Sequence, residues 1–182
     1  GGQLTDWAGH HIDIANWGMD LEKTAPVEIE GSGVWPRGTE GLFDTVEHYR
    51  FTCKYRNGLT MIVSGMLPGG TRFEGEHGWV HVDRGNLHTE PKSLLTEVIG
   101  PDELHLYNSS NHIANFLDCV KTRALTITPV DAAHHSIMVG HLGLIAMKLE
   151  RPVRFNPDTE RFVNDPEADR LLSRPMREPW TL

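Results

Sequence analysis

The sequence predicts an α+β domain in which an open, predominantly antiparallel sheet has helices packed on one of its faces. Apolar and polar residues alternate with period two through the middle of the chain, from about residue 26 to residue 90. Helical periodicity marks the beginning of the chain and returns in its last third. Strands grouped between helices favour α+β architecture over repeated βαβ units. We therefore expect a single domain over residues 1–182.

Short strands joined by turns account for the middle of the chain. The Asn57-Gly58 pair between two alternating runs is a strong hairpin signal, because both central residues of a type I′ turn need positive φ. His77-Gly78 and Arg84-Gly85 separate further strands. The expected strands are 27–32, 49–55, 59–63, 72–76, 79–83 and 87–90, with a short edge strand at 153–155.

Helices are expected on both sides of this strand region. The first covers about Leu4 to Met19 and contains no Gly-Pro break. Ser109 and Ser110 can cap a second helix, whose apolar residues recur at i, i+3, i+4 and i+7. Thr128-Pro129 begins a third that runs to about Leu149. The two long helices are expected to cover one sheet face, before a last helical turn at 166–172 and an extended tail.

Composition excludes several classes of function. The chain has 17 basic and 25 acidic residues and a formal net charge of -8, which argues against nucleic-acid binding through phosphate contacts. No apolar run approaches the ~18–20 residues that span a bilayer, and no secretory signal is visible. The two cysteines lack C-x-x-C spacing, and Cys53 reads as a small core residue. These features favour a reduced, cytoplasmic setting.

The first helix carries the candidate chemistry. At about 100° per residue, Asp6, His10, Asp13 and Trp17 fall within roughly 40° of one line along a mostly apolar helix. Such a narrow acidic and histidine stripe suits the wall of a pocket. Asp6 and His10 are i, i+4 neighbours, and a carboxylate beside an imidazole orients it and raises its basicity, as a general acid or base requires. A structural hydrogen bond or a helix N-terminal carboxylate explains the same spacing.

Other chemistries find less support in the sequence. His10 and His11 point about 100° apart on one helix and cannot share a metal ion, so no metal site is expected. Neither G-x-G-x-x-G, a P-loop nor a Gly-x-Ser-x-Gly elbow occurs, so no residue of this chain is assigned to a nucleotide cofactor. Trp35 begins a glycine-containing loop, to Asp44, that is a candidate lining of a substrate pocket.

Residues 2–17 read GQLTDWAGHHIDIANW and resemble the helix that opens the C-terminal domain of the Gfo/Idh/MocA oxidoreductases. The similarity is to a bacterial subgroup with a G-G-x-L-T-D-W-G-x-H-H-x-D pattern, from which Ala8-Gly9 departs only in the order of two small residues. It extends over nearly the whole chain. Further matching stretches are 41–45, 73–75, 78–80, 82–85, 111–120, 141–143, 164–168 and 171–174.

This resemblance implies an oxidoreductase that uses NAD or NADP on a sugar, inositol or related polyol. The family's Asp-x-x-x-His motif matches Asp6 and His10, so His10 is the expected acid/base and Asp6 its partner or a hydroxyl anchor. Asp13, Trp17 and Trp35 are the further expected substrate contacts. The family's N-terminal Rossmann domain and its E-K-P lysine are absent from these residues, so we expect an inactive C-terminal half that binds no cofactor alone.

The sequence leaves two alternative functions open and predicts one protein partner. An NAD-dependent glycoside-cleaving enzyme on this scaffold would use the same residues. A non-catalytic dimerisation or interaction module would use none of them. A homodimer through the open sheet face is expected, because a face with Tyr49, Phe51 and Tyr55 would otherwise expose an apolar patch.

Overall fold

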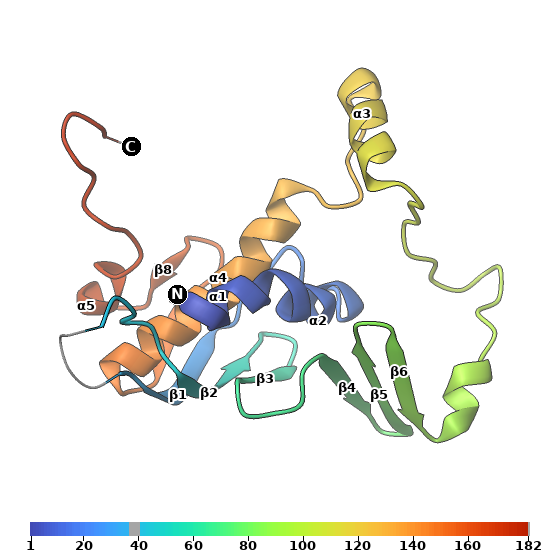
Figure 1. The fold of residues 1–182 in the computed structure, drawn as a ribbon, viewed down its shortest axis with the longest axis horizontal. Helices are drawn as coiled ribbons and strands as arrows, with labels where there is room; N and C mark the ends of the chain where they lie inside the picture. Colours follow the sequence, from blue (N-terminus) through green and yellow to red (C-terminus); the bar gives the residue numbers. More distant parts are fainter. Residues whose placement is uncertain (37–40, 182) are drawn as a thin grey trace.

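The computed structural model describes residues 1–36 and 41–181, so part of the Trp35–Asp44 loop lies outside the described residues. Two antiparallel sheets form its framework, and their strand orders are β3-β2-β1-β7-β8 and β4-β5-β6 (Figure 1). The α+β class expected from the sequence is confirmed. The strands are β1 (Glu28–Val34), β2 (His48–Lys54), β3 (Thr60–Ser64), β4 (Thr71–Gly75), β5 (Gly78–Asp83), β6 (Asn86–Glu90), β7 (Val153–Asn156) and β8 (Arg161–Phe162).

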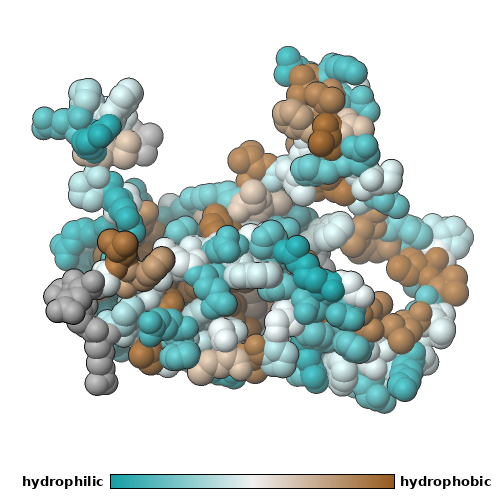
Figure 2. All heavy atoms as spheres, viewed as in Figure 1, coloured by the Kyte–Doolittle hydropathy of each residue, from teal (hydrophilic) through white to brown (hydrophobic). Residues whose placement is uncertain are grey.

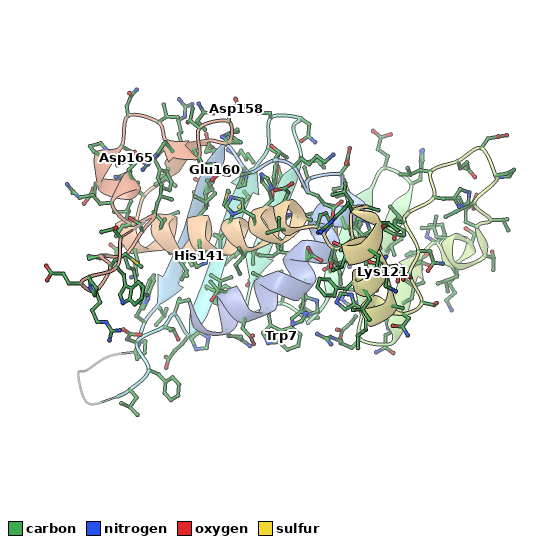
Figure 3. The ribbon with its side chains drawn as sticks, turned by 90° about the horizontal axis from the view of Figure 1, so that it is seen from above. Trp7, Lys121, His141, Asp158, Glu160 and Asp165 are labelled. Atoms are coloured by element: carbon green, nitrogen blue, oxygen red, sulfur yellow. The ribbon has the colours of Figure 1, made fainter. Side chains whose placement is uncertain are left out.

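The helical elements lie before, between and after these strands. The long helix α4 crosses the larger sheet, and the N-terminal helix lies beside α4 on the same side (Figure 3). The expected first helix is present but is not uniform, because a π-helical turn divides it. The elements are α1 (Gly2–Trp7), the π turn η1 (Ala8–Ile12), α2 (Asp13–Gly18), the 3-10 turn η2 (Lys92–Thr96), α3 (His112–Thr122), α4 (Val130–Leu149) and α5 (Pro166–Asp169).

The core lies between α4 and the inner face of the larger sheet. Tyr49, Phe51 and Tyr55 are all buried there, so the expectation that they form an exposed apolar patch is wrong. Alternation along a strand sends the intervening side chains to the opposite face. That outer face is polar and charged, with Glu28 paired to Lys54 across β1 and β2 at 2.6 Å. A homodimer through this face stays a prediction, but its apolar rationale does not apply.

The hairpin lies where the Asn57-Gly58 pair predicted it, but the expected type I′ turn is wrong. Gly58 adopts a φ of +87°, whereas the φ of Asn57 is not positive. The Gly58 amide donates to the Tyr55 carbonyl at 3.0 Å, and the Asn57 side chain accepts a hydrogen bond from the Leu59 amide at 3.1 Å. The glycine thus supplies the left-handed residue of a longer loop that closes β2 against β3. The strand β7 differs from its prediction, because it pairs with both β1 and β8 and is not an edge.

Helix α3 stands away from both sheets (Figure 1). Its N-cap is Asn111, which accepts from the Ala114 amide at 2.9 Å, in place of the expected Ser109 and Ser110. The expectation that two long helices cover one sheet face holds for α4 and is wrong for α3. Apolar side chains gather on the exposed surface of α3 (Figure 2). The exposed apolar residues of α3 are Ile113, Phe116, Leu117 and Val120.

Candidate functional site

The π turn explains how the N-terminal helix packs. Leu4, Ala8, Ile12 and Asn16 are each at most 5% exposed, at successive intervals of four residues. In a straight α-helix, at about 100° per residue, these twelve residues would drift about 120° around the axis. The amide of Asp13 bonds instead to the carbonyl of Ala8, five residues back. This wider turn absorbs about one residue and cuts the drift to about 20°.

The same turn separates the residues of the predicted stripe. The π turn contains one residue more than an α-helical turn. Every residue after η1 therefore lies about 100° behind the position around the helix axis that uniform α-helical spacing from Asp6 would give it. Asp13 and Trp17 therefore leave the line through Asp6 and His10. The uniform 100° spacing used for the sequence is wrong from η1 onward, because it has no place for the extra residue in the turn.

Asp6 and His10 remain together on the exposed side of the helix. Both are exposed, and Asp6 lies opposite the buried line that runs from Leu4 to Asn16. Within residues 1–36 and 41–181, no hydrogen bond joins Asp6 to His10 or either of them to another side chain. Neither residue lines the large cleft described below. Neither side chain is buried in the core or held by a hydrogen bond to another side chain in the part of the chain that the structure describes.

A cluster of aromatic rings lies next to His10. Trp7 stacks on His11 with 5.0 Å between ring centroids, and its ring meets His10 edge-on at 5.6 Å. Trp7 extends from the side of the helix away from α4 (Figure 3). The Arg84 guanidinium, from the turn after β5, lies 5.4 Å from the Trp7 ring, a cation–π contact.

Trp7 and His11 line a cleft of about 1030 Å³ between the N-terminal helix, β3 and the β4–β5 hairpin. His81, Asp83 and Arg84 contribute polar groups to it. Burial lowers the pKa of His11, Asp83 opposes this shift, and Arg84 adds to it. The His11 Nδ1 atom is buried without a hydrogen-bond partner in the described residues.

Asp13 faces α4 and not the exposed side. Its Oδ1 accepts a hydrogen bond from the Ser136 hydroxyl at 2.7 Å, and Ser136 is 1% exposed. The Asn16 amide nitrogen lies 3.5 Å from the same hydroxyl oxygen. These contacts form a polar seam between α2 and α4, which gives Asp13 a structural role in this packing.

The two predicted tryptophans lie apart from each other and from the cleft. Trp17 is 39% exposed on α2. Trp35, directly after β1, is partly buried and packs against the hydrophobic core. Neither lines the cleft. Substrate contact by Asp13, Trp17 and Trp35 remains a prediction.

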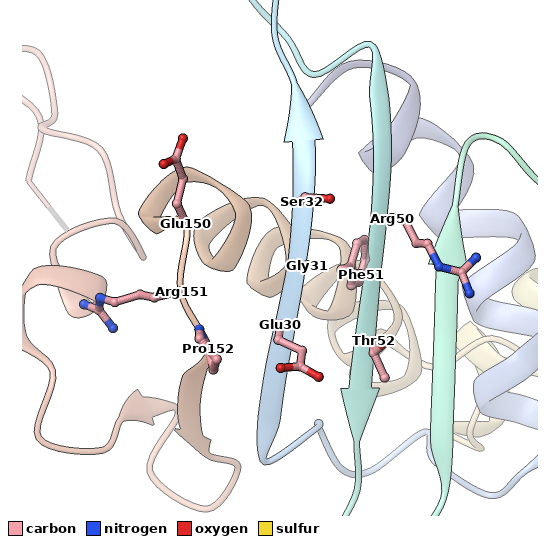
Figure 4. A pocket seen from close by; sticks show the side chains of 9 residues that line it. All are labelled: Glu30, Gly31, Ser32, Arg50, Phe51, Thr52, Glu150, Arg151 and Pro152. Carbon is pink, nitrogen blue, oxygen red and sulfur yellow. The ribbon is translucent and has the colours of Figure 1, made fainter.

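A second hollow, of about 400 Å³, lies on the outer face of the larger sheet (Figure 4). It is shallow, and side chains from β1, β2 and the end of α4 surround it (Figure 4). Its charged residues are Glu30, Arg50, Glu150 and Arg151. None of the predicted site residues lines it.

Sequence reasoning missed several residues around the π turn. Trp7 and His11 lie inside the motif that named Asp6 and His10, so their position was a signal for them. Arg84 comes from a turn that the sequence identified only by its glycine. Thr71, whose hydroxyl donates to the His11 carbonyl at 2.7 Å, has no local signal, because the contact joins residues 60 positions apart.

Three features of the described residues bear on cofactors, metal ions and membranes. Every strand pairing among them is antiparallel, whereas a dinucleotide fold needs parallel βαβ units. The described residues therefore do not form a dinucleotide-binding fold of the βαβ type. Across the described ranges, three or more His, Cys, Asp or Glu residues nowhere converge as metal ligands. No helix there is long and apolar enough to span a bilayer.

Comparison with known protein families identifies the family of this chain. A family model described as "Oxidoreductase family, C-terminal alpha/beta domain" matches residues 1–182. The chain belongs to the Gfo/Idh/MocA oxidoreductase family. The matched region is the C-terminal α/β domain of that family, as the motif around Asp6 and His10 indicated. A comparison with curated proteins gave no match.

Solved structures share the fold of this Gfo/Idh/MocA domain. An NAD-binding protein from Listeria innocua is 13% identical with a TM-score of 0.58, over 85% of this chain and 51% of that one. An aldose-aldose oxidoreductase from Caulobacter crescentus, complexed with glycerol, is 16% identical with a TM-score of 0.53, over 85% of this chain and 52% of that one. The domain thus spans about half the length of these structures.

Proposed function

We propose that this domain is the substrate-binding and catalytic half of an NAD(P)-dependent oxidoreductase that acts on a hydroxyl group of a sugar, inositol or related polyol. The observation that carries the proposal is the position of Asp6 and His10. They share the exposed side of a helix whose other side is buried, and no hydrogen bond in the described residues occupies them. Folding accounts for Leu4, Ala8 and Ile12 but not for this pair.

The proposed chemistry assigns one role to each side chain. Oxidation of an alcohol removes the proton of the hydroxyl group and a hydride from the carbon that bears this hydroxyl. His10 accepts the hydroxyl proton, because an imidazole nitrogen offers a lone pair to a proton within hydrogen-bond reach. Asp6, one helical turn away, favours the resulting imidazolium or anchors a neighbouring hydroxyl. The hydride acceptor is assigned to NAD or NADP bound outside the residues of this chain.

The accessible surface of the domain is unusually large, which supports the presence of a partner that covers part of it. Its accessible surface is 13370 Å², whereas a globular protein of this mass exposes about 8,800 Å². The excess is several times the roughly 800 Å² that each side of a standard interface buries. We infer that a nucleotide-binding half covers part of this surface, including the side that carries His10. On this proposal the domain alone is inactive.

Substitution of His10 in the complete oxidoreductase tests the assignment. His10→Ala is expected to lower kcat by about 10²–10⁴-fold, the usual contribution of a general acid or base. The matched control is His134→Ala. This variant removes an exposed imidazole of α4, which contacts Glu160 at 2.8 Å. Circular dichroism of both variants confirms that each still folds.

The measurement is substrate-dependent reduction of NAD(P) with a panel of sugars, inositols and polyols. Near-normal turnover in His10→Ala, with His134→Ala also active, would refute the role of His10. Release of free sugar without net formation of reduced cofactor would instead identify a glycoside-cleaving enzyme.

A further inference from the structure

The π turn that carries His10 is supported from outside the helix. π-helical turns are rare, and they occur mostly as single turns inside α-helices, frequently at functional sites. Burial of Leu4 and Ala8 fixes the rotation of the helix before the turn, and burial of Asn16 fixes it afterwards. The core therefore requires an extra residue between the two halves. Ala8 and Ile12, at the two ends of the turn, are buried, whereas Gly9, His10 and His11 between them are not, so core burial alone does not hold these intervening residues.

Thr71 supplies that missing constraint. It is the first residue of β4, is 8% exposed, and donates its hydroxyl to the His11 carbonyl oxygen at 2.7 Å. A hydroxyl inserted against a helical carbonyl is a recognised cause of local departure from α-helical geometry. The bond reaches the backbone of the residue directly after His10. Thr71 thus contacts the residue that directly follows the candidate acid/base in the sequence.

The small sheet β4-β5-β6 contacts the N-terminal helix at two further points. Phe73, on the same strand as Thr71, lies so close to Gly18 that a Cβ there would be 2.7 Å from the ring. Arg84, after β5, lies over Trp7, whose ring edge meets His10. Contacts before, within and after the turn hold this sheet against the helix. Of these three contacts, which all lie within the described ranges, the Thr71 contact is the hydrogen bond to the turn itself.

We propose that Thr71 is a positioning residue for the proposed reaction, whose hydroxyl bond to the His11 carbonyl holds the π turn in the orientation that presents His10 on the exposed side of the helix. The inference rests on the proposed function of His10. Thr71 lies at the wall of the cleft, but it is 8% exposed and its hydroxyl donates to the His11 carbonyl, so its proposed action is through the backbone of the turn. Loss of the bond frees the turn without removing any group from the reaction.

The first test measures the turn in the domain itself and does not depend on activity. Thr71→Val removes the hydroxyl and keeps the β-branched shape, whereas Thr71→Ser keeps the hydroxyl. Amide hydrogen exchange at Ile12 and Asp13 is expected to accelerate about tenfold or more in Thr71→Val and to stay within about twofold of wild type in Thr71→Ser. Exchange in the middle of α4 reports whether the fold persists. Thr71→Ala repeats the test without the β-branch if Thr71→Val perturbs α4.

The second test measures catalysis in the complete oxidoreductase. Misplacement of a catalytic group by about 1 Å costs up to about 10²-fold in rate, so Thr71→Val is expected to lower kcat by about 10–100-fold with KM changed less than about twofold. Thr71→Ser is expected to restore most of kcat. A general effect on folding would not separate kcat from KM or be rescued by serine.

The outcomes distinguish the two proposals. Unchanged amide exchange in Thr71→Val overturns the support of the turn by Thr71, whatever the role of His10. Accelerated exchange with normal kcat, in an enzyme that His10→Ala inactivates, overturns the positioning role alone. Normal turnover in His10→Ala overturns the proposed function, and with it the catalytic part of this inference.

Discussion

Gly143 of α4 packs directly against the ring of Phe51 in β2, and this contact sets how closely the helix approaches the sheet. A Cβ at residue 143 would overlap the ring atoms Cζ, Cε1 and Cε2. The ring has no room to retreat, because Phe51 is 1% exposed and Gly31 of β1 packs against its Cβ side. Gly143→Ala therefore inserts a methyl group into a filled space.

Two opposing effects decide the magnitude. Overpacking a well-packed core costs about 1–3 kcal/mol, and the confined ring places this site at the upper end. Alanine in place of glycine inside a helix returns about 1 kcal/mol. Gly143→Ala is therefore expected to lower the free energy of unfolding by about 2 kcal/mol, the difference between these two effects. This is a large part of the roughly 5–15 kcal/mol that is typical of a domain.

Urea denaturation of the domain, followed by circular dichroism and tryptophan fluorescence, measures this change. Phe51→Leu removes the overlapping ring atoms, so Gly143→Ala should cost at least about 1 kcal/mol less in that background. Gly9→Ala is the matched control, because nothing lies within 4 Å of the added methyl group. An equal cost of Gly143→Ala in both backgrounds would refute the packing argument.

Two further predictions concern single side chains. The Arg151 guanidinium, which donates to Asp165 at 2.6 and 2.9 Å, lowers the pKa of that carboxyl, and Asp165 also caps α5. Because this pKa is lower in the folded than in the unfolded state, its stabilising contribution is present above the ordinary aspartate range and is lost as pH falls through the folded value. The protection factor against amide exchange at Ala168 should fall over that acid range in wild type but not in Asp165→Asn. Burial raises the pKa of the fully buried Cys53 thiol, so a thiol reagent should label Cys53 only after unfolding, as mass spectrometry would show; rapid labelling of the folded domain would contradict its core position.

Features set by neighbouring residues were predictable from the sequence. The hairpin at Asn57-Gly58 forms where it was expected, because the positive φ of Gly58 is a local requirement, although the type I′ turn does not form. The antiparallel strand region and the α4 helix were likewise identified by periodicity. The family was identified from the motif around Asp6 and His10, and the match over residues 1–182 confirms it.

Features set by distant contacts were not predictable in the same way. The π turn arises because Leu4, Ala8, Ile12 and Asn16 must all reach one buried line, and their burial depends on α4 and the sheet. No propensity of the local residues indicates it. The placement of Asp13 against Ser136 follows from that turn, and so the predicted stripe of four residues became a pair. The direction in which Tyr49 and Phe51 point also depends on which face α4 covers.

The exposed apolar side of α3 has a practical consequence for production of this domain. Hydrophobic surface without a cover recruits chaperones and promotes self-association, so the yield of soluble material depends on what else is made with it. Ile113 and Phe116 are 70% and 56% exposed, and they are suitable positions for polar replacements. Such replacements would favour a monodisperse sample, and their effect on assembly with the proposed nucleotide-binding half would reveal whether α3 is part of that junction.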